Sequence, residues 1–460
     1  MIKIYSAKKI ITMDNNWPVA THVAVRNGYI LGIGDEKCAD GWGEAVLDNR
    51  FEDKVLLPGL IEAHAHVSAG GVWRYTYCGH YTRTDPEGKE WSGLNTYDAL
   101  IDRLKTEAQL LPPGQPVIGW GFDPNFLDGS RLNRHHLDKV SDLHPVIVLQ
   151  SNFHVLTANT FALQKAHLLN GSNTEGVLIG DDGLASGELQ EFEAMRPVME
   201  KSNVSIKDLS DGAALKNYGK ISQRCGVTTA ADLLSDLDRN EVNMLEAVTG
   251  QADFPIRYVP IMNAMDNDPN LEAKRALELR SRSTDKLHLG RAKLFTDGAI
   301  QAGTAKLKEP GYFKIKDQGI WNMDVLHFKN AVKVLHSAGV KTHIHCNGDL
   351  ASELAISAYE EALIESPNPD LRHTLEHVQL ADISQFRRMR ALGLTANIFA
   401  NHLYYFGDIH WTKSIGPQRA TRMDACRDAH EIFDGCFAIH SDAPVTPMSP
   451  LFTAWCAVNR

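Results

Sequence analysis

Short apolar segments alternate with helical segments through the second half of the chain, from about residue 213 onward. This alternation is typical of a parallel β-sheet whose strands are joined by crossover helices. Helical patterns cover residues 326–338, 352–365 and 383–392. Strand patterns cover residues 227–230, 256–260, 290–295, 341–345, 373–377, 394–398 and 436–440. These seven strands are one fewer than the eight that close a (β/α)8 barrel.

The missing strand lies much earlier, at residues 57–66, and it ends in His64-Ala65-His66. Side chains two apart on a strand point to the same face, so His64 and His66 can converge on one point. Imidazole is a common ligand of zinc and similar ions. We therefore predict an α/β fold, a (β/α)8 or TIM barrel, with its active site at the C-terminal ends of the strands.

The rest of the chain does not fit the barrel repeat. Residues 1–56 contain short β patterns around the turn Asn27-Gly28 and predict a small N-terminal β domain, part of a β-sandwich. Residues 57–69 then form the first barrel strand, and 213–460 the remainder of the barrel. Residues 70–212, with strand-like runs at 116–120 and 145–149, are interpreted as a large insertion that shapes the pocket.

Four more chemically capable side chains lie at or near the ends of predicted barrel strands. They are Lys293, His345, His377 and Asp442. Each alone has an ordinary structural explanation: a strand-end histidine, a lysine that reaches solvent, an aspartate in a turn. Their occurrence in order on successive strands, after the His-x-His pair, indicates one shared site.

The order His-x-His, Lys, His, His, Asp resembles that of the amidohydrolase superfamily. The local motifs are similar to those of one branch, the YtcJ-like amidohydrolase 3 family, and the resemblance covers nearly the whole chain. The matching segments are 57–66, 293–298, 345–349, 376–379 and 441–444, with further signatures at 119–123, 152–154 and 157–159.

The resemblance implies a divalent metal cofactor, with zinc expected. His64 and His66 would bind one ion, and His345 with His377 would bind a second. An ammonium group cannot ligate a cation, but in lysine-bearing relatives the lysine reacts with CO2 to give a carbamate that bridges two ions. We expect two ions if Lys293 is carbamylated, and an unmodified Lys293 beside one ion is the competing state. Asp442 would contact a metal and act as general base.

Family insertion residues that face the pocket correspond to His154, Asp123 and Trp120, for which a substrate-binding role is predicted. A structural role for His154 is left open. His343 and His373 share strand faces with the expected ligands and are assigned to lower layers of the barrel. For His440, two residues before Asp442, core packing and hydrogen bonding to the site are both left open.

Charge and cysteine usage limit the possible partners and compartments. The formal net charge is −10 and no basic run occurs, so neither nucleic acid nor an anionic membrane is an expected partner. The seven cysteines are scattered without a Cys-x-x-Cys motif, which favours a reducing cytoplasm. A small-molecule substrate is expected, and a homo-oligomer is left open.

The reaction implied by the resemblance is hydrolysis of a C–N bond in an amide, an N-acyl or N-formyl compound, or a cyclic amide. Metal-dependent deamination is an alternative, but deaminases of this superfamily usually lack the lysine and carry His-x-x-Glu, whereas Gly348 follows His345 here. A non-catalytic binding or regulatory descendant is a second alternative. It is motivated by the chain end at 451–460, inside an expected helix, where relatives continue and complete the N-terminal β domain.

Overall fold

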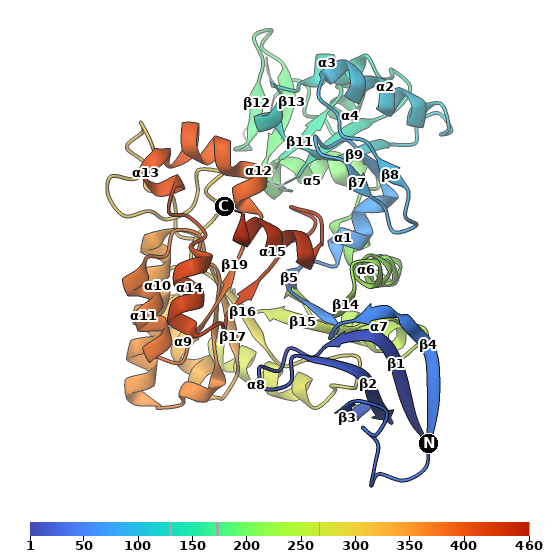
Figure 1. Ribbon diagram of the computed structural model, residues 1–460. Helices are drawn as coiled ribbons and strands as arrows, with labels where there is room; N and C mark the ends of the chain where they lie inside the picture. Colours follow the sequence, from blue (N-terminus) through green and yellow to red (C-terminus); the bar gives the residue numbers. More distant parts are fainter. Residues whose placement is uncertain (128–130, 152, 154, 172–173, 266, 460) are drawn as a thin grey trace. The chain divides into compact units, whose positions relative to one another are not determined.

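The computed structural model describes residues 1–127, 131–151, 153, 155–171, 174–265 and 267–459. The chain forms two compact units, Met1–Leu60 and Ile61–Arg460. The first is a small β unit, and the second contains the barrel with its insertion (Figure 1).

The first unit is a four-stranded sheet with the order β3-β2-β1-β4. Its strands are β1 (Ile2–Ile11), β2 (Val19–Arg26), β3 (Tyr29–Gly34) and β4 (Ala45–Leu56). The hairpin between β2 and β3 turns at Asn27 and Gly28, which both have positive φ, 53° and 80°, as a type I′ turn requires. Strand β1 also pairs with β4 in parallel. Ile2, Ile4 and Ala24 form part of its small core.

The second unit is built around eight parallel strands, which confirms the predicted barrel. The first and last strands are linked where Asp442 N donates to His64 O at 3.0 Å and His66 N donates to Ala443 O at 2.7 Å. Because the strands are parallel, their C-terminal ends all lie at the same edge of the barrel. In sheet order the strands are β5 (Leu60–Ala65), β14 (Val227–Ser235), β15 (Arg257–Asn263), β16 (Ala292–Phe295), β17 (Thr342–Cys346), β18 (Thr374–His377), β19 (Thr395–Ile398) and β20 (Ala438–Ile439).

Helices connect the strands, and most begin with a side chain that caps the first turn. Asp238, Asp268, Asp324 and Asp382 each accept a backbone N–H at such a position. The longer helices are α6 (Gly212–Arg224), α7 (Arg239–Thr249), α8 (Pro269–Arg280), α9 (Val325–Ser337), α10 (Asp349–Glu365), α11 (Ile383–Ala391), α12 (His402–Ile409), α14 (Cys426–Phe433) and α15 (Pro450–Val458). No helix among the described residues is long and apolar enough to cross a membrane.

The insertion forms its own six-stranded sheet, with the order β12-β13-β11-β10-β9-β6. The two expected strands are β9 (Val117–Phe122) and β10 (Val146–Gln150), and both are buried throughout. The other strands were not predicted, because each is short or mixes polar with apolar residues. They are β6 (Thr76–Tyr77), β11 (Val155–Ala158), β12 (Val177–Ile179) and β13 (Ala185–Gln190). Helices α2 (Tyr97–Ala108), α3 (Arg134–Asp138), α4 (Thr160–Lys165) and α5 (Glu191–Lys201) accompany this sheet.

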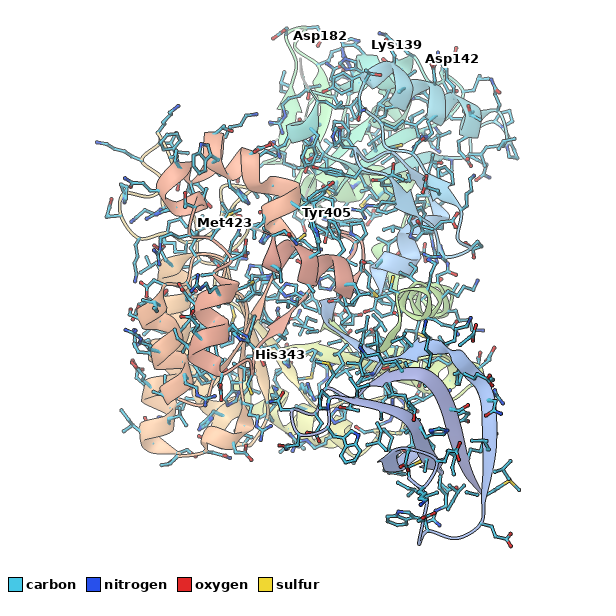
Figure 2. All side chains as sticks on the ribbon, in the orientation of Figure 1. Lys139, Asp142, Asp182, His343, Tyr405 and Met423 are labelled. Carbon is cyan, nitrogen blue, oxygen red and sulfur yellow. The ribbon has the colours of Figure 1, made fainter. Side chains whose placement is uncertain are left out.

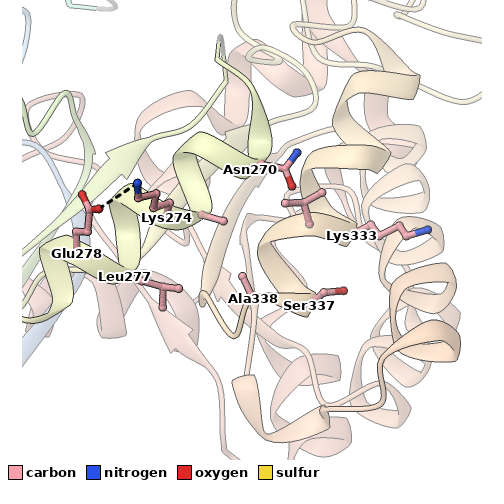
Figure 3. A pocket seen from close by; sticks show the side chains of 9 residues that line it. Asn270, Lys274, Leu277, Glu278, Lys333, Ser337 and Ala338 are labelled. Atoms are coloured by element: carbon pink, nitrogen blue, oxygen red, sulfur yellow. Dashed lines mark ion pairs between the residues drawn. The ribbon is translucent and has the colours of Figure 1, made fainter.

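A groove of about 830 Å³ lies between α8 and α9, on the outside of the barrel (Figure 3). Its side chains are mostly exposed, and Lys274 and Glu278 pair with each other across one helical turn at 3.9 Å. None of the side chains predicted to bind metal or substrate lines it. This groove is therefore separate from the predicted chemistry.

One arginine ties the insertion to the loop that carries Asp442. The two terminal nitrogens of Arg83 donate to Pro444 O at 2.6 Å and Val445 O at 2.8 Å. Its guanidinium also lies over the rings of Tyr77 and Trp120, at 5.6 and 5.4 Å. A planar, doubly donating cation stacked on aromatic faces is a role that lysine does not fill.

We expect Arg83→Ala to lower the free energy of unfolding by about 2–3 kcal/mol, because two charge-assisted hydrogen bonds and the ring contacts are lost. Arg83→Lys should fall between the wild type and Arg83→Ala. Urea denaturation followed by tryptophan fluorescence measures both. An Arg83→Ala midpoint equal to that of the wild type would show that this link does not stabilise the fold.

Candidate metal centre

The structure brings the six predicted strand-end side chains to one edge of the barrel. His64 lies on β5, Lys293 on β16, His345 on β17 and His377 at the end of β18. His66 directly follows β5, and Asp442 lies three residues after the end of β20. His64, Lys293 and His377 are buried, with exposed fractions of 1–2%. His66 and Asp442 are partly exposed, so the site can be reached from outside.

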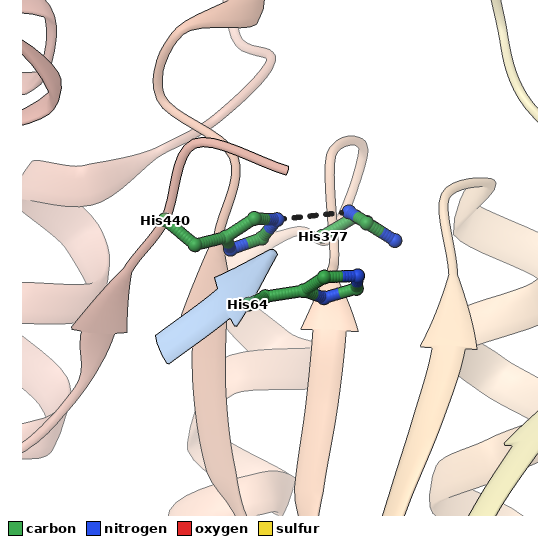
Figure 4. A group of neighbouring side chains, drawn as sticks. All are labelled: His64, His377 and His440. Atoms are coloured by element: carbon green, nitrogen blue, oxygen red, sulfur yellow. Dashed lines mark hydrogen bonds between the residues drawn. The ribbon is translucent and has the colours of Figure 1, made fainter. Parts of the chain in front are cut away.

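Two sets of donor atoms lie side by side at this edge. Asp442 Oδ1 is 3.3 Å from His64 Nε2 and 3.2 Å from His66 Nε2. His345 Nδ1 is 3.1 Å from His377 Nε2. The rings of His64 and His377 connect the two sets, with centroids 4.8 Å apart. Two groups of side chains have donor atoms close enough together to hold a metal ion, His64-His66-Asp442 and His64-His377-His440. The second group includes His440, which the sequence did not assign as a ligand (Figure 4).

The protonation states at this edge suit a cation. Burial lowers the pKa of His345 to about 3 and that of His377 well below its usual 6.5, so both rings are neutral. His345 Nε2 donates to the carbonyl of Gly298 at 3.1 Å, which leaves the lone pair of Nδ1 directed at His377. Two imidazole nitrogens 3.1 Å apart are close enough to bind the same metal ion.

The other side of the site carries negative charge. The pKa of Asp442 is lowered, because the hydrogen bond and charge of His66 outweigh burial, which opposes ionisation. Burial would lower the pKa of His66, but its contacts with Asp232 and Asp442 raise it to about 9. A proton on His66 is thus stabilised between these carboxylates, and a metal ion bound by His66 Nε2 would replace it. The donor set of imidazoles and a carboxylate fits a divalent metal such as zinc.

Lys293, which was predicted to carry a carbamate, is buried at this edge of the barrel. Its side chain is 1% exposed, and Nζ has no hydrogen-bond partner among the described residues. Burial lowers the pKa of Lys293, although Glu376 and Asp442 oppose this effect. The lowered pKa favours the neutral amine, which is the form that can react with CO2.

Two carboxylates behind the His-x-His pair were missed in the sequence. Glu376 Oε2 lies 2.9 Å from His64 Nδ1, and Asp232 Oδ1 lies 3.4 Å from His66 Nδ1. Glu376 directly precedes His377, so strand alternation would place the two on opposite faces. His377 instead has a positive φ of 67°, which breaks the alternation at the strand end. A single sequence gives no signal for such a turn.

His343 and His373 lie below the site. His343 Nδ1 is 2.7 Å from Glu376 Oε1, and the residue is labelled in Figure 2. His373 is buried beside Thr342 and His336, away from the predicted ligands. His343 therefore lies in the barrel interior, where it contacts the carboxylate that orients His64. His373 instead packs against His336 of α9 and Tyr359 of α10, on the helix side of the barrel wall, so its assignment to a lower barrel layer is wrong.

The family assignment rests on a match that covers most of the chain. A model of the amidohydrolase family matches residues 52–460. This chain belongs to the amidohydrolase family. The resemblance noted in the sequence is thereby confirmed, and with it a hydrolase assignment. Together with the donor atoms described above, membership supports a divalent metal in this amidohydrolase.

Curated relatives are distant but span the chain. It is 25% identical to Protein LONG AFTER FAR-RED 3 of Arabidopsis thaliana, over 98% of this chain and 76% of that protein. It is 24% identical to the putative amidohydrolase YtcJ of Bacillus subtilis, over 100% and 84%. It is also 24% identical to the N-substituted formamide deformylase of Arthrobacter pascens, over 98% and 82%.

The fold is shared with a solved structure. An uncharacterized metal-dependent hydrolase from Pyrococcus horikoshii matches with a TM-score of 0.74 at 19% identity, over 100% of this chain and 86% of that one. At this level of identity the match supports the fold of the amidohydrolase and not its substrate.

The predicted substrate-binding residues lie in the insertion. Trp120 is 1% exposed and packs against Trp73 and Tyr77, and it lines a cavity of about 270 Å³ that Ala443 also lines. The carboxylate of Asp123 accepts from the N–H of Asn125 at 2.9 Å. His154 lies outside the described residues. A substrate role for these three residues stays a prediction.

Asp297, in the loop after the Lys293 strand, organises the backbone around the site. Its carboxylate accepts the N–H groups of Asn347 at 3.0 Å, Gly348 at 2.8 Å and Lys306 at 2.8 Å. Burial raises the pKa of Asp297 to about 7, and these three donors oppose that rise. The loops that follow β16 and β17 are held together by this one side chain.

We expect Asp297→Asn to lower the free energy of unfolding by about 1–3 kcal/mol, because the amide NH2 faces a buried N–H and leaves it without an acceptor. Chemical denaturation of the metal-free protein gives this value. Asp102→Asn, at a side chain that is 76% exposed, serves as the matched control and should be neutral. Equal stability of the two variants would contradict the anchoring role of Asp297.

Proposed function

We propose that this amidohydrolase hydrolyses a C–N bond of a small molecule, in an amide, an N-acyl or N-formyl compound, or a cyclic amide, with zinc as its metal. The observation that carries the proposal is the convergence of four imidazoles and an ionised carboxylate beside a buried lysine whose Nζ has no hydrogen-bond partner among the described residues. The relative named for its action on N-substituted formamides makes N-formyl compounds the first substrates to test.

Different residues would bind the metal, transfer the proton and orient the ligands. His64, His66 and Asp442 would hold one ion and His345 with His377 a second. A divalent cation in this position polarises a carbonyl and makes a water molecule more acidic. Asp442 is ionised, partly exposed and paired with His66 at 3.2 Å, so it can accept a proton from the attacking water and pass it to the leaving nitrogen. The buried carboxylates Glu376 and Asp232 keep the first two histidines oriented.

Deamination is less well supported. The residue three after His345 is Gly348, whose N–H is bound by Asp297, so it offers no side chain to act as acid or base. Lys293 occupies the interior of the site. These features favour hydrolysis of an amide-type bond.

The decisive test combines metal analysis with a substrate panel. Protein purified in the presence of Zn²⁺ should hold about two equivalents of metal, and chelation should abolish its hydrolysis of N-formyl, N-acyl or cyclic amide substrates. Adding back Zn²⁺, Mn²⁺ or Co²⁺ identifies the ion that restores activity. Protein that takes up no metal under these conditions would refute the proposal and favour a non-catalytic binding role.

For the general base, we expect Asp442→Asn to reduce kcat by about 10²–10⁴, because the proton acceptor is lost. The four histidines remain, so most of the metal content should be retained, as elemental analysis will show. Asp102→Asn is the surface control. An Asp442→Asn enzyme with wild-type kcat would exclude Asp442 as the base.

For Lys293, we propose that the neutral amine attacks CO2, forming an N–C bond and losing a proton to give a carbamate. The expected result is that Lys293→Ala loses metal and activity and that a short carboxylate such as acetate restores part of both. In the wild type, ¹³C-labelled bicarbonate should give a carbamate carbonyl resonance by NMR. Full metal content in Lys293→Ala without any added carboxylate would favour an unmodified lysine.

A further inference from the structure

His440 is the site residue whose role the sequence left open, and the structure gives it an unusual setting. It is 1% exposed. Its ring lies nearly parallel to that of His64, with centroids 4.6 Å apart and planes at 15°, and to that of Phe399, at 5.1 Å and 25°. Both ring nitrogens are in hydrogen bonds, with His377 and with Asn397. The ring is therefore held in both position and orientation (Figure 4).

The direction of these hydrogen bonds is fixed by Asn397. Its Nδ2 lies 2.7 Å from Glu376 Oε2 and 3.3 Å from the carbonyl oxygen of Ala63. A carbonyl oxygen only accepts, so the NH2 of Asn397 must face this side. Its Oδ1 then faces His440 Nδ1, at 3.0 Å.

The protons of two further histidines follow from this orientation. Because Asn397 Oδ1 only accepts, His440 Nδ1 carries a proton and, in the neutral ring, His440 Nε2 accepts. His377 Nδ1, 3.1 Å away, must then donate, which leaves the lone pair of His377 Nε2 free toward His345. At the other end, Glu376 Oε2 accepts from His64 Nδ1, so His64 Nε2 faces Asp442 without a proton.

We propose that Asn397 and His440 are positioning residues that set which nitrogen of His377 carries its proton. With Glu376 they form a continuous relay, His377-His440-Asn397-Glu376-His64, that turns the Nε2 lone pairs of both outer histidines toward the metal centre. The inference rests on the proposed metal-dependent function and deepens it. His440 acts through His377 and is not itself a ligand.

The first test measures Zn²⁺ binding, with affinity from competition with a chelating dye and stoichiometry from elemental analysis. His440→Phe should bind the wild-type number of ions about 10–100-fold more weakly, since loss of such orienting bonds has this effect. His440→Gln, which keeps one acceptor and one donor, should lie closer to the wild type. His373→Phe, at an equally buried histidine outside the relay, is the matched control and should bind as the wild type does.

Asn397→Leu provides an independent variant, which also serves if His440→Phe does not fold. Asn397 is hydrogen-bonded to none of the proposed ligands, so the same 10–100-fold weakening there would show action through its relay partners, His440 and Glu376. Loss of one whole equivalent of Zn²⁺ in His440→Phe, with the rest bound at full affinity, would identify His440 as a ligand and overturn the relay. Affinities of His440→Phe and Asn397→Leu equal to that of His373→Phe would also overturn it.

The second test needs no metal. In metal-free protein labelled with ¹⁵N-histidine, long-range ¹H–¹⁵N spectra should show His377 protonated at Nδ1 in the wild type, and this state should be lost in His440→Phe. Wild-type protein that binds no Zn²⁺ but shows this tautomer would refute the proposed function and leave the relay standing. His377 protonated at Nε2 in the wild type would refute the relay, whatever the metal result.

Discussion

The structure depends on one electrostatic constraint at the C-terminal edge of the barrel. The neutral imidazoles of His345 and His377 face each other at 3.1 Å, and the ionised Asp442 lies 3.2–3.3 Å from His64 and His66, in a largely buried site. Lone pairs at such distances repel unless a cation or shared proton lies between them, and low local dielectric strengthens the repulsion. The surrounding hydrogen bonds are all arranged to hold the lone pairs inward. A metal-binding edge accounts for this arrangement better than a structural core does.

Much of this site could be predicted because a barrel has a simple geometry. Strand alternation relates His64 to His66, and strand order brings Lys293, His345 and Asp442 to the same edge, although up to 378 positions separate them, from residue 64 to residue 442. The sequence pattern also located three of the longer helices, α9, α10 and α11. These features depend on local pattern and on topology, which a sequence expresses directly.

The site residues that were not predicted are placed by local backbone conformations that the sequence does not reveal. Glu376 faces the barrel interior as its strand partner Asn397 does, and His377 reaches the same site because it takes a positive φ. Asp442, three residues after β20, also has a positive φ, of 51°. Such conformations are uncommon outside glycine and appear in no pattern of hydrophobicity. The polar strands of the insertion were missed for a related reason: β13 contains glycine and glutamate and is defined by its partners rather than by its own composition.

The two histidines of the His-x-His pair differ in what lies behind them, and this difference has a consequence for metal binding. Asp232 orients His66 and also accepts a hydrogen bond from the hydroxyl of Tyr258 at 2.6 Å. Neither contact connects Asp232 to a second proposed ligand. Glu376 orients His64 and, through Asn397 and His440, also reaches His377. Under the proposed assignment these two histidines belong to different ions. One buried carboxylate would then preorganise a ligand of each ion, and occupation of one position would stiffen the ligand of the other. Two ions held by such a shared framework are expected to bind with positive coupling, because the second ion meets a ligand whose orientation the first has already fixed.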